Sequence, residues 1–149
     1  MMINLDMPYP PSVNHYYRHV TINGRPRTLI SREGREYRTK VCGLLASGRG
    51  NGPRKPPAGG RIALAMDAFP PDRRRRDIDN LLKSVQDSLA HAGVYEDDSQ
   101  IDLLAVRRCQ PAPGGRLTVR VGVMPLEACP LCGAQHTNER PQANDDSES

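Results

Sequence analysis

The sequence predicts an α+β fold, a single small domain in which a mixed sheet carries its helices on one face. Its 149 residues, 37% of them hydrophobic, suffice for one modest core. Strand-like alternation and helix-like spacing follow one another in the order β-α-β-α-β-β. We therefore expect a folded domain over residues 1–125 and a polar, disordered tail over residues 126–149.

The first half of the chain contains one predicted strand and one predicted helix. Apolar residues at positions 3, 5 and 7 alternate with polar ones before Pro8, which predicts a short strand. Residues 9–18 are rich in aromatic and polar residues and are expected to form a loop. From Arg32 to about Ala46 the apolar residues have helical spacing, and Ser31 is a suitable N-cap.

The second half supplies the rest of the sheet. Residues 47–60 are rich in Gly and Pro, which predicts an irregular connection. Residues 61–69 alternate as a strand, and residues 81–92 have helical spacing that stops at Gly93. Residues 101–107 and 117–123 predict two further strands, the second after a turn at residues 113–115.

Positive charge is concentrated in one region. Residues 18–76 hold 15 Lys and Arg but 4 Asp and Glu, although the net charge of the chain is only +4. Such a block suits a polyanion partner, and a solvated basic face explains it equally well. No apolar run is long enough to span a membrane and no signal segment is visible, so we expect a cytoplasmic protein without a membrane partner.

The charged run at residues 71–80 has the composition of a metal-dependent phosphodiester site. Asp77 and Asp79 would point to one side of an extended backbone, with Ile78 toward the core. Paired carboxylates suit Mg²⁺, and the acidic cluster at residues 96–98 could add a ligand. Lys83, four residues after Asp79, would lie beside it on a helix and could bind the scissile phosphate. The structural alternative is that Asp79 is an N-cap and Lys83 its ordinary neighbour.

The four arginines Arg73, Arg74, Arg75 and Arg76 lie inside the fold, between a strand and a helix. Their guanidinium groups could bind phosphate oxygens in bidentate fashion and offset the repulsion among the nearby carboxylates. Tyr16 and Tyr17 could stack on an unpaired base, but core packing is at least as plausible for one of them.

Two cysteines in the tail have the spacing of half a zinc site. Cys129 and Cys132 are separated by two residues and followed by Gly133, with His136 nearby. Four ligands are needed and only three are local, so a homodimer could complete the site, or Cys109 could join it. The alternative is a mobile tail with two incidental thiols.

The chain resembles the RusA family of Holliday junction resolvases, small phage and prophage endonucleases. The resemblance covers about residues 3–124 and is carried by residues 10–18, the run at residues 71–80, Lys83 and the pair at residues 97–98. It implies that Asp77, Asp79 and Asp98 are catalytic metal ligands and that Lys83 is catalytic. It also suggests DNA contacts by Asn14, Tyr17, Arg18 and the arginine run.

The resemblance further implies a homodimer that depends on Mg²⁺, with Mn²⁺ as a possible substitute, and that needs no organic cofactor. The expected activity is the resolution of four-way DNA junctions by paired symmetric cuts, in recombination and repair. Two alternatives stay open: a metal-dependent nuclease that prefers forks or flaps, and a junction-binding protein that does not cleave.

Overall fold

The centre of the protein is a four-stranded mixed sheet with the strand order β1-β6-β4-β5. The computed structural model describes residues 2–48, 59–124, 128–129 and 131–134. The strands are β1 (Met2–Met7), β4 (Ile62–Phe69), β5 (Ile101–Arg108) and β6 (Arg116–Val123). β6 pairs antiparallel with both β1 and β4, whereas β4 and β5 run parallel. A parallel pair needs a long crossover, and the crossover from β4 to β5 carries most of the predicted site.

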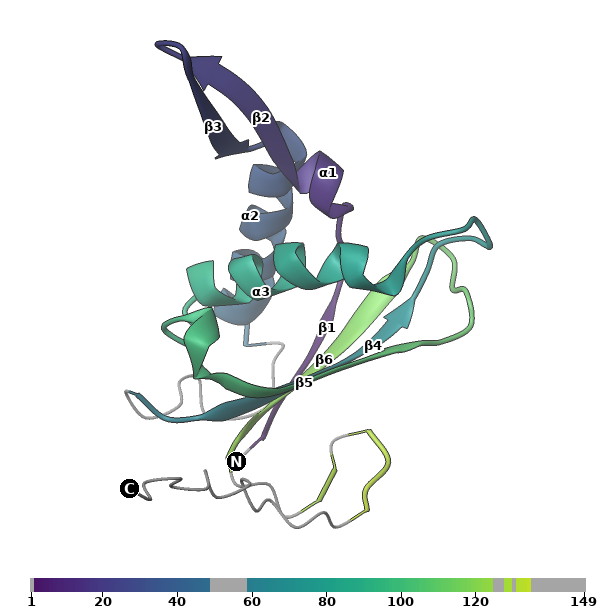
Figure 1. Ribbon diagram of the computed structural model, residues 1–149. Helices are drawn as coiled ribbons and strands as arrows, with labels where there is room; N and C mark the ends of the chain where they lie inside the picture. The colour runs from purple at the N-terminus through teal and green to yellow at the C-terminus, as the bar shows by residue number, and fades with distance from the viewer. Residues whose placement is uncertain (1, 49–58, 125–127, 130, 135–149) are drawn as a thin grey trace, which may run out of the picture.

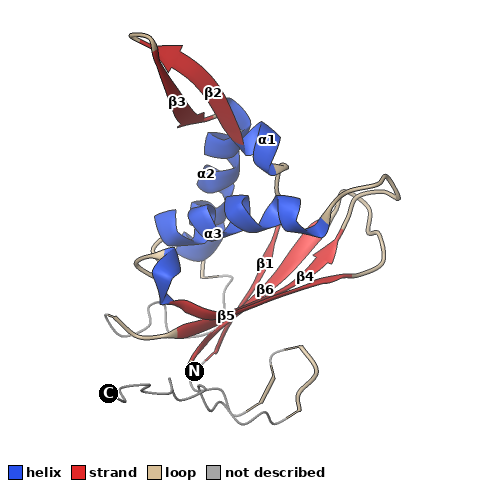
Figure 2. Ribbon diagram, viewed as in Figure 1, coloured by secondary structure: helices blue, strands red, loops and turns tan. Residues whose placement is uncertain are grey.

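Two helices cover the same face of the sheet (Figures 1 and 2). They are α2 (Arg32–Ala46) and α3 (Leu82–His91). The α+β class and the mixed sheet are as predicted. Ser31 caps α2 as expected, since its side chain accepts a hydrogen bond from the Gly34 amide at 3.0 Å. Gly93, with φ of +78°, ends the segment that contains α3.

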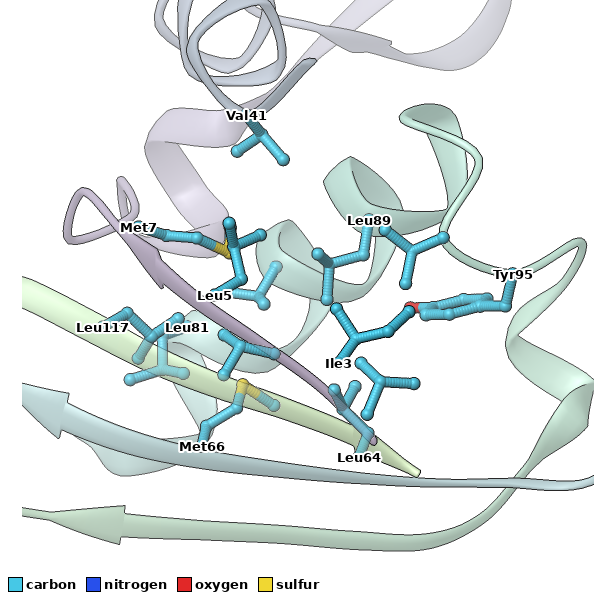
Figure 3. Packing of buried hydrophobic residues seen from close by; sticks show 14 of the residues in the cluster. Ile3, Leu5, Met7, Val41, Leu64, Met66, Leu81, Leu89, Tyr95 and Leu117 are labelled. Carbon is cyan, nitrogen blue, oxygen red and sulfur yellow. The ribbon is translucent and has the colours of Figure 1, made fainter. Parts of the chain in front are cut away.

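The core lies between the sheet and these helices (Figure 3). Strand β4 is central, and residues 62–68 are all buried, so both faces of this strand are covered. Its larger side chains, Leu64 and Met66, belong to the same cluster as Val85 and Leu89 of α3. Burying one such side chain contributes about 1.5–3 kcal/mol, so this interface fixes the crossover on the sheet.

A β-hairpin that the sequence interpretation missed stands away from the sheet (Figure 1). It consists of β2 (Tyr17–Ile22) and β3 (Arg25–Ile30), preceded by the short helix α1 (Val13–Tyr16). The predicted order β-α-β-α-β-β is therefore incomplete, and the expected loop at residues 9–18 is partly helix and strand. The turn residues Asn23 and Gly24 have φ of 52° and 71°, as a two-residue hairpin turn requires.

The hairpin is attached to the rest of the protein at the start of α2. The Ser31 amide donates to the Tyr16 carbonyl at 2.9 Å, and the Ser31 hydroxyl donates to the His15 carbonyl. Gly34 packs so closely that a Cβ placed there would lie 2.4 Å from the Tyr16 oxygen. One helix start therefore holds both α1 and the base of the hairpin.

The predicted tail lies mostly outside the described residues. Residues 49–58, 125–127, 130 and 135–149 are not described, so the predicted connection and the predicted disorder stay predictions. Around the cysteine pair, the Gly133 amide donates to the Cys129 carbonyl at 2.8 Å and the Cys129 amide donates to the Ala134 carbonyl at 2.6 Å. These bonds close a short turn. Among the described residues no helix is both long and apolar enough to span a membrane.

Candidate active site

The candidate site is built on the crossover that leaves β4 and returns as β5. The crossover contains the charged run, the 3-10 turn η1 (Ile78–Leu81), helix α3 and a second 3-10 turn, η2 (Asp98–Gln100). Leu81, Val85 and Leu89 are buried against the sheet, which turns the opposite, polar side of this segment to solvent. The fold thus presents the predicted acidic and basic residues along one surface segment.

Asp72 organises the arginine run. Its Oδ1 accepts a hydrogen bond from the Arg74 amide at 2.9 Å and another from Arg76 Nη1 at 2.5 Å. The bond from Arg76, and then that from the Arg74 backbone, lower the pKa of Asp72 to about 2. The four arginines are therefore not equivalent. Arg76 is half-buried and held by a close ion pair with Asp72, whereas Arg73, Arg74 and Arg75 are exposed, with Arg74 Nε 3.8 Å from Asp72 Oδ2.

Asp77 and Asp79 are two residues apart, but the backbone that joins them is not one extended strand. Asp77 is extended, with φ of −78° and ψ of 136°, and precedes η1, while Asp79 lies within that turn. The predicted geometry, in which an extended backbone points both carboxylates to one side, is therefore wrong. Ile78 is only half-buried. Both carboxylates are exposed, and neither forms a hydrogen bond or ion pair with another described residue.

An ion pair with Lys83 links Asp98 to helix α3 in the candidate site. The Lys83 Nζ atom lies 3.0 Å from Asp98 Oδ2 and 2.9 Å from Asp87 Oδ1. The expected α-helix beginning at Asp79 is wrong, because Asp79 lies in the 3-10 turn η1 and α3 begins only at Leu82, so helical spacing does not place Lys83 beside Asp79. Asp98 itself is held by η2, which Asp97 and Gln100 cap reciprocally.

One oxygen of Asp98 lacks a protein partner. Asp98 Oδ1 is buried and makes no hydrogen bond within the described part of the chain. A buried acceptor without a donor is costly, and a cation would satisfy it. The donor chemistry therefore suits a hard divalent cation.

However, no three His, Cys, Asp or Glu side chains lie close enough to share a metal ion among the described residues. Asp77, Asp79 and Asp98 thus do not form one coordination shell in this conformation.

Asp87 is a candidate residue that the sequence interpretation did not single out. Its carboxylate is mostly buried, with 18% of the side chain exposed. Burial and then the charge of Asp98 raise the pKa of Asp87 to about 6, even though the Lys83 ammonium lies beside it. The spacing of four residues from Lys83 was the available signal in the sequence.

Two open grooves flank the arginine run. One, of about 730 Å³, is lined by Tyr9, His15, Arg75, Asp77 and Asn80 among others. The other, of similar size, contains the arginines from Arg73 to Arg76 together with Arg108. The guanidinium groups that line both grooves would offset the repulsion between the nearby Asp77 carboxylate and a DNA phosphate.

The N-terminal candidates divide into a core residue and surface residues. Tyr16 is fully buried, and its hydroxyl accepts a hydrogen bond from Arg38 Nε at 2.7 Å, so packing is its role. Tyr17 is half-buried beside it, with ring centroids 4.8 Å apart. Asn14 and Arg18 are exposed, and Arg18 lines a third groove with Arg38, between the hairpin and α2. None of these residues lines the two grooves beside the arginine run.

Comparison with known proteins identifies the family. A family profile described as Endodeoxyribonuclease RusA matches residues 8–122. The crossover junction endodeoxyribonuclease rusA of Enterobacteria phage HK97 is 39% identical over 115 residues, covering 77% of this chain and 89% of the phage protein. The protein of the same name from Escherichia coli strain K12 is 38% identical over 121 residues, covering 81% of this chain and 94% of that protein. That of Enterobacteria phage 82 is 39% identical over 121 residues, with the same coverage of 81% and 94%. The chain therefore belongs to the RusA family of endodeoxyribonucleases.

Proposed function

We propose that this chain is a crossover junction endodeoxyribonuclease, as its relatives are named, and that the junctions it cuts are four-way DNA junctions. The observation that carries the proposal is the cluster on the crossover, where Lys83 lies 3.0 Å from Asp98 and a run of exposed arginines precedes Asp77. Carboxylates, an ammonium and guanidinium groups are the side chains that metal-assisted phosphodiester hydrolysis uses. A cytoplasmic location is part of the proposal.

The proposal assigns the divalent cation to three carboxylates. Asp77, Asp79 and Asp98 would hold Mg²⁺, and the buried, unpartnered Oδ1 of Asp98 supports this assignment. When bound, Mg²⁺ polarises the phosphate and lowers the pKa of a water molecule. Since the Asp77 and Asp79 carboxylates are exposed and form no hydrogen bond or ion pair with another described residue, these side chains can reorient without breaking such a contact.

The remaining side chains have separate tasks in the proposal. Lys83 stabilises negative charge on the phosphate oxygens during cleavage. Arg73, Arg74 and Arg75 bind the DNA backbone and orient it, which gives affinity without reading bases. A homodimer with two-fold symmetry would present two such sites to the two symmetry-related strands of a junction. The products would carry a 5′-phosphate and a 3′-hydroxyl.

The experiment that tests the function compares three DNA substrates under one salt condition. Purified protein is incubated with a synthetic four-way junction, a replication fork and a linear duplex, with Mg²⁺, with Mn²⁺ and with EDTA. The proposal predicts cation-dependent paired cuts, fastest on the junction. Faster cleavage of the fork would support the flap or fork nuclease instead. Junction binding without any cleavage would support the non-catalytic alternative.

Zinc binding by Cys129 and Cys132 stays a separate proposal. It is supported by the two-residue spacing of the cysteines and by the backbone hydrogen bonds between Cys129 and residues 133 and 134. Two thiolates supply half of a tetrahedral shell, so two further donors are needed. Zinc analysis of protein purified without chelator tests this directly. A zinc content near zero would exclude the site.

A further inference from the structure

The Lys83 ammonium lies between the carboxylates of Asp87 and Asp98, and the proposed function assigns a role only to Asp98. Lys83 Nζ is 2.9 Å from Asp87 Oδ1 and 3.0 Å from Asp98 Oδ2. The Lys83 side chain is 54% exposed, whereas those of Asp87 and Asp98 are 18% and 31% exposed. The half-exposed lysine is thus attached to the protein by two less exposed partners.

A single carboxylate would restrain this lysine weakly. An ion pair at an exposed site contributes little to stability, and it must offset the rotamer entropy that a long lysine side chain loses when it is held in place. Two carboxylates on separate elements restrict the ammonium far more, because it must satisfy both at once. Asp87 is one turn along the same helix, so α3 itself fixes its distance from the Lys83 backbone.

Asp98 and Asp87, the two partners of Lys83, would have different roles during DNA cleavage. In the proposed function Asp98 turns its free oxygen to a cation, which weakens the attraction between Asp98 and Lys83. Asp87 is given no such task, because its Oδ1 lies 2.9 Å from the Lys83 ammonium and the Asp98 charge that also acts on it is repulsive. A cation at Asp98 would weaken that repulsion, so the Asp87 contact with Lys83 is expected to persist when Asp98 engages the cation.

The location of Asp87 is unfavourable for stability alone. Burial and the nearby Asp98 charge disfavour its ionised form, and burial followed by the Asp98 and Asp87 charges also raises the pKa of Tyr95. A mostly buried acid beside another acid is typical of functional sites rather than of surface ion pairs. This cost is consistent with a role in holding Lys83.

We propose that Asp87 is a positioning residue, whose carboxylate holds the Lys83 ammonium beside Asp98 without itself contacting DNA or the cation. The inference rests on the proposed nuclease function. It extends the site by one residue, on the helix face next to Lys83.

A double-mutant cycle tests the inference. Asp87→Asn, Lys83→Met and the double variant are compared with the wild type, and Asp87→Glu tests for rescue. The matched control is Glu36→Gln, which removes another pair at the same spacing, Arg32–Glu36 at 2.9 Å, on α2. Three quantities are measured: the single-turnover cleavage rate of a four-way junction with Mg²⁺, the junction Kd in Ca²⁺, and the Tm.

We expect Asp87→Asn to lower the cleavage rate about 10-fold, corresponding to one unit in log rate. The junction Kd should change less than about threefold, because the neutral amide removes no DNA contact. Asp87→Glu should recover part of the lost rate, and Glu36→Gln should cleave at the wild-type rate. In the Lys83→Met background, Asp87→Asn should cause no further loss, because it acts through the missing ammonium.

Three outcomes would overturn the inference: an unchanged rate in Asp87→Asn, a rate loss matched by an equal loss of junction affinity, or a loss of the same size with and without Lys83. The first two outcomes can be recognised even if the Lys83→Met variant does not cleave DNA. A wild-type protein that does not cleave would instead refute the proposed function, so the two failures are distinguishable.

Discussion

Replacing either of two glycines in helix α2 with alanine is expected to change the stability of the protein, in opposite directions for the two sites. Gly34 is buried at the start of α2, and a Cβ built there would lie 2.4 Å from the Tyr16 carbonyl oxygen and 2.8 Å from Ile30 Cγ2. Gly43 is exposed near the other end of α2, and a Cβ there meets nothing within 4 Å. Neither glycine has a positive φ, so alanine fits the backbone at both positions. The pair therefore isolates the effect of packing.

The magnitudes follow from two opposing terms. Alanine is more favourable than glycine in a helix by about 0.5–1 kcal/mol, and this gain applies to both sites. At Gly34 the backbone oxygen cannot move aside easily, so overpacking costs about 1–3 kcal/mol. The net expectation is a loss of up to about 2.5 kcal/mol for Gly34→Ala and a gain of about 0.5–1 kcal/mol for Gly43→Ala. At roughly 2–4 °C per kcal/mol for a chain of this size, the two variants should shift Tm in opposite directions.

Calorimetry or thermal circular dichroism on the two variants, side by side at one protein concentration, measures the difference. The urea midpoint should follow the same order, with Gly43→Ala above the wild type and Gly34→Ala below it. If Gly34→Ala were as stable as Gly43→Ala, the close packing of α2 on the base of the hairpin would be refuted.

Three further predictions concern charge. Asp67 is buried on β4 and accepts a hydrogen bond from Arg120 Nη2 at 2.8 Å. Asp67→Asn should therefore lower the free energy of unfolding by about 1–3 kcal/mol. Urea denaturation measures this loss, and an unchanged urea midpoint would contradict it. The pKa of Asp72 is lowered to about 2, first by the bond from Arg76, so its ionised form is stabilised by folding. The stability difference between wild type and Asp72→Asn should be fully present above the ordinary carboxyl pKa and should disappear as the pH falls toward 2; a difference that grows on acidification would have the wrong sign. Each Gln substitution among the exposed residues 73–75 should reduce the slope of log K against log salt for junction binding by about 1, and unchanged slopes would exclude phosphate contacts there.

Local signals in the sequence were sufficient for the larger elements. Helix α2 begins after Ser31 as predicted, because a cap and helical spacing depend only on neighbouring residues. The β2–β3 hairpin was missed because most of its side chains are exposed on both faces, which removes the alternation that marks a half-buried strand. The Asn23-Gly24 pair was nevertheless a usable turn signal.

The sequence names the candidate residues of the site but does not determine their geometry. Asp79 and Asp87 are both four residues from Lys83, so spacing alone cannot decide which one pairs with the lysine. The decision depends on the 3-10 turn before α3, which removes Asp79 from the helical register. The contact from Lys83 to Asp98 is tertiary, since it depends on the return of the chain toward β5. Whether Asp77 and Asp79 join Asp98 around a cation stays a prediction.

The most direct test of the proposed site is the effect of Asp98→Asn on junction cleavage. The single-turnover rate with Mg²⁺ and the junction Kd in Ca²⁺ are measured for the wild type, for Asp98→Asn and for the control Asp6→Asn, which alters an exposed acid on β1. The account predicts that Asp98→Asn loses at least about 100-fold in rate, in the range for loss of a group that stabilises charge at the reacting phosphate, while Kd changes little. Asp6→Asn should behave like the wild type. Cleavage by Asp98→Asn at the wild-type rate would contradict the assignment of the site.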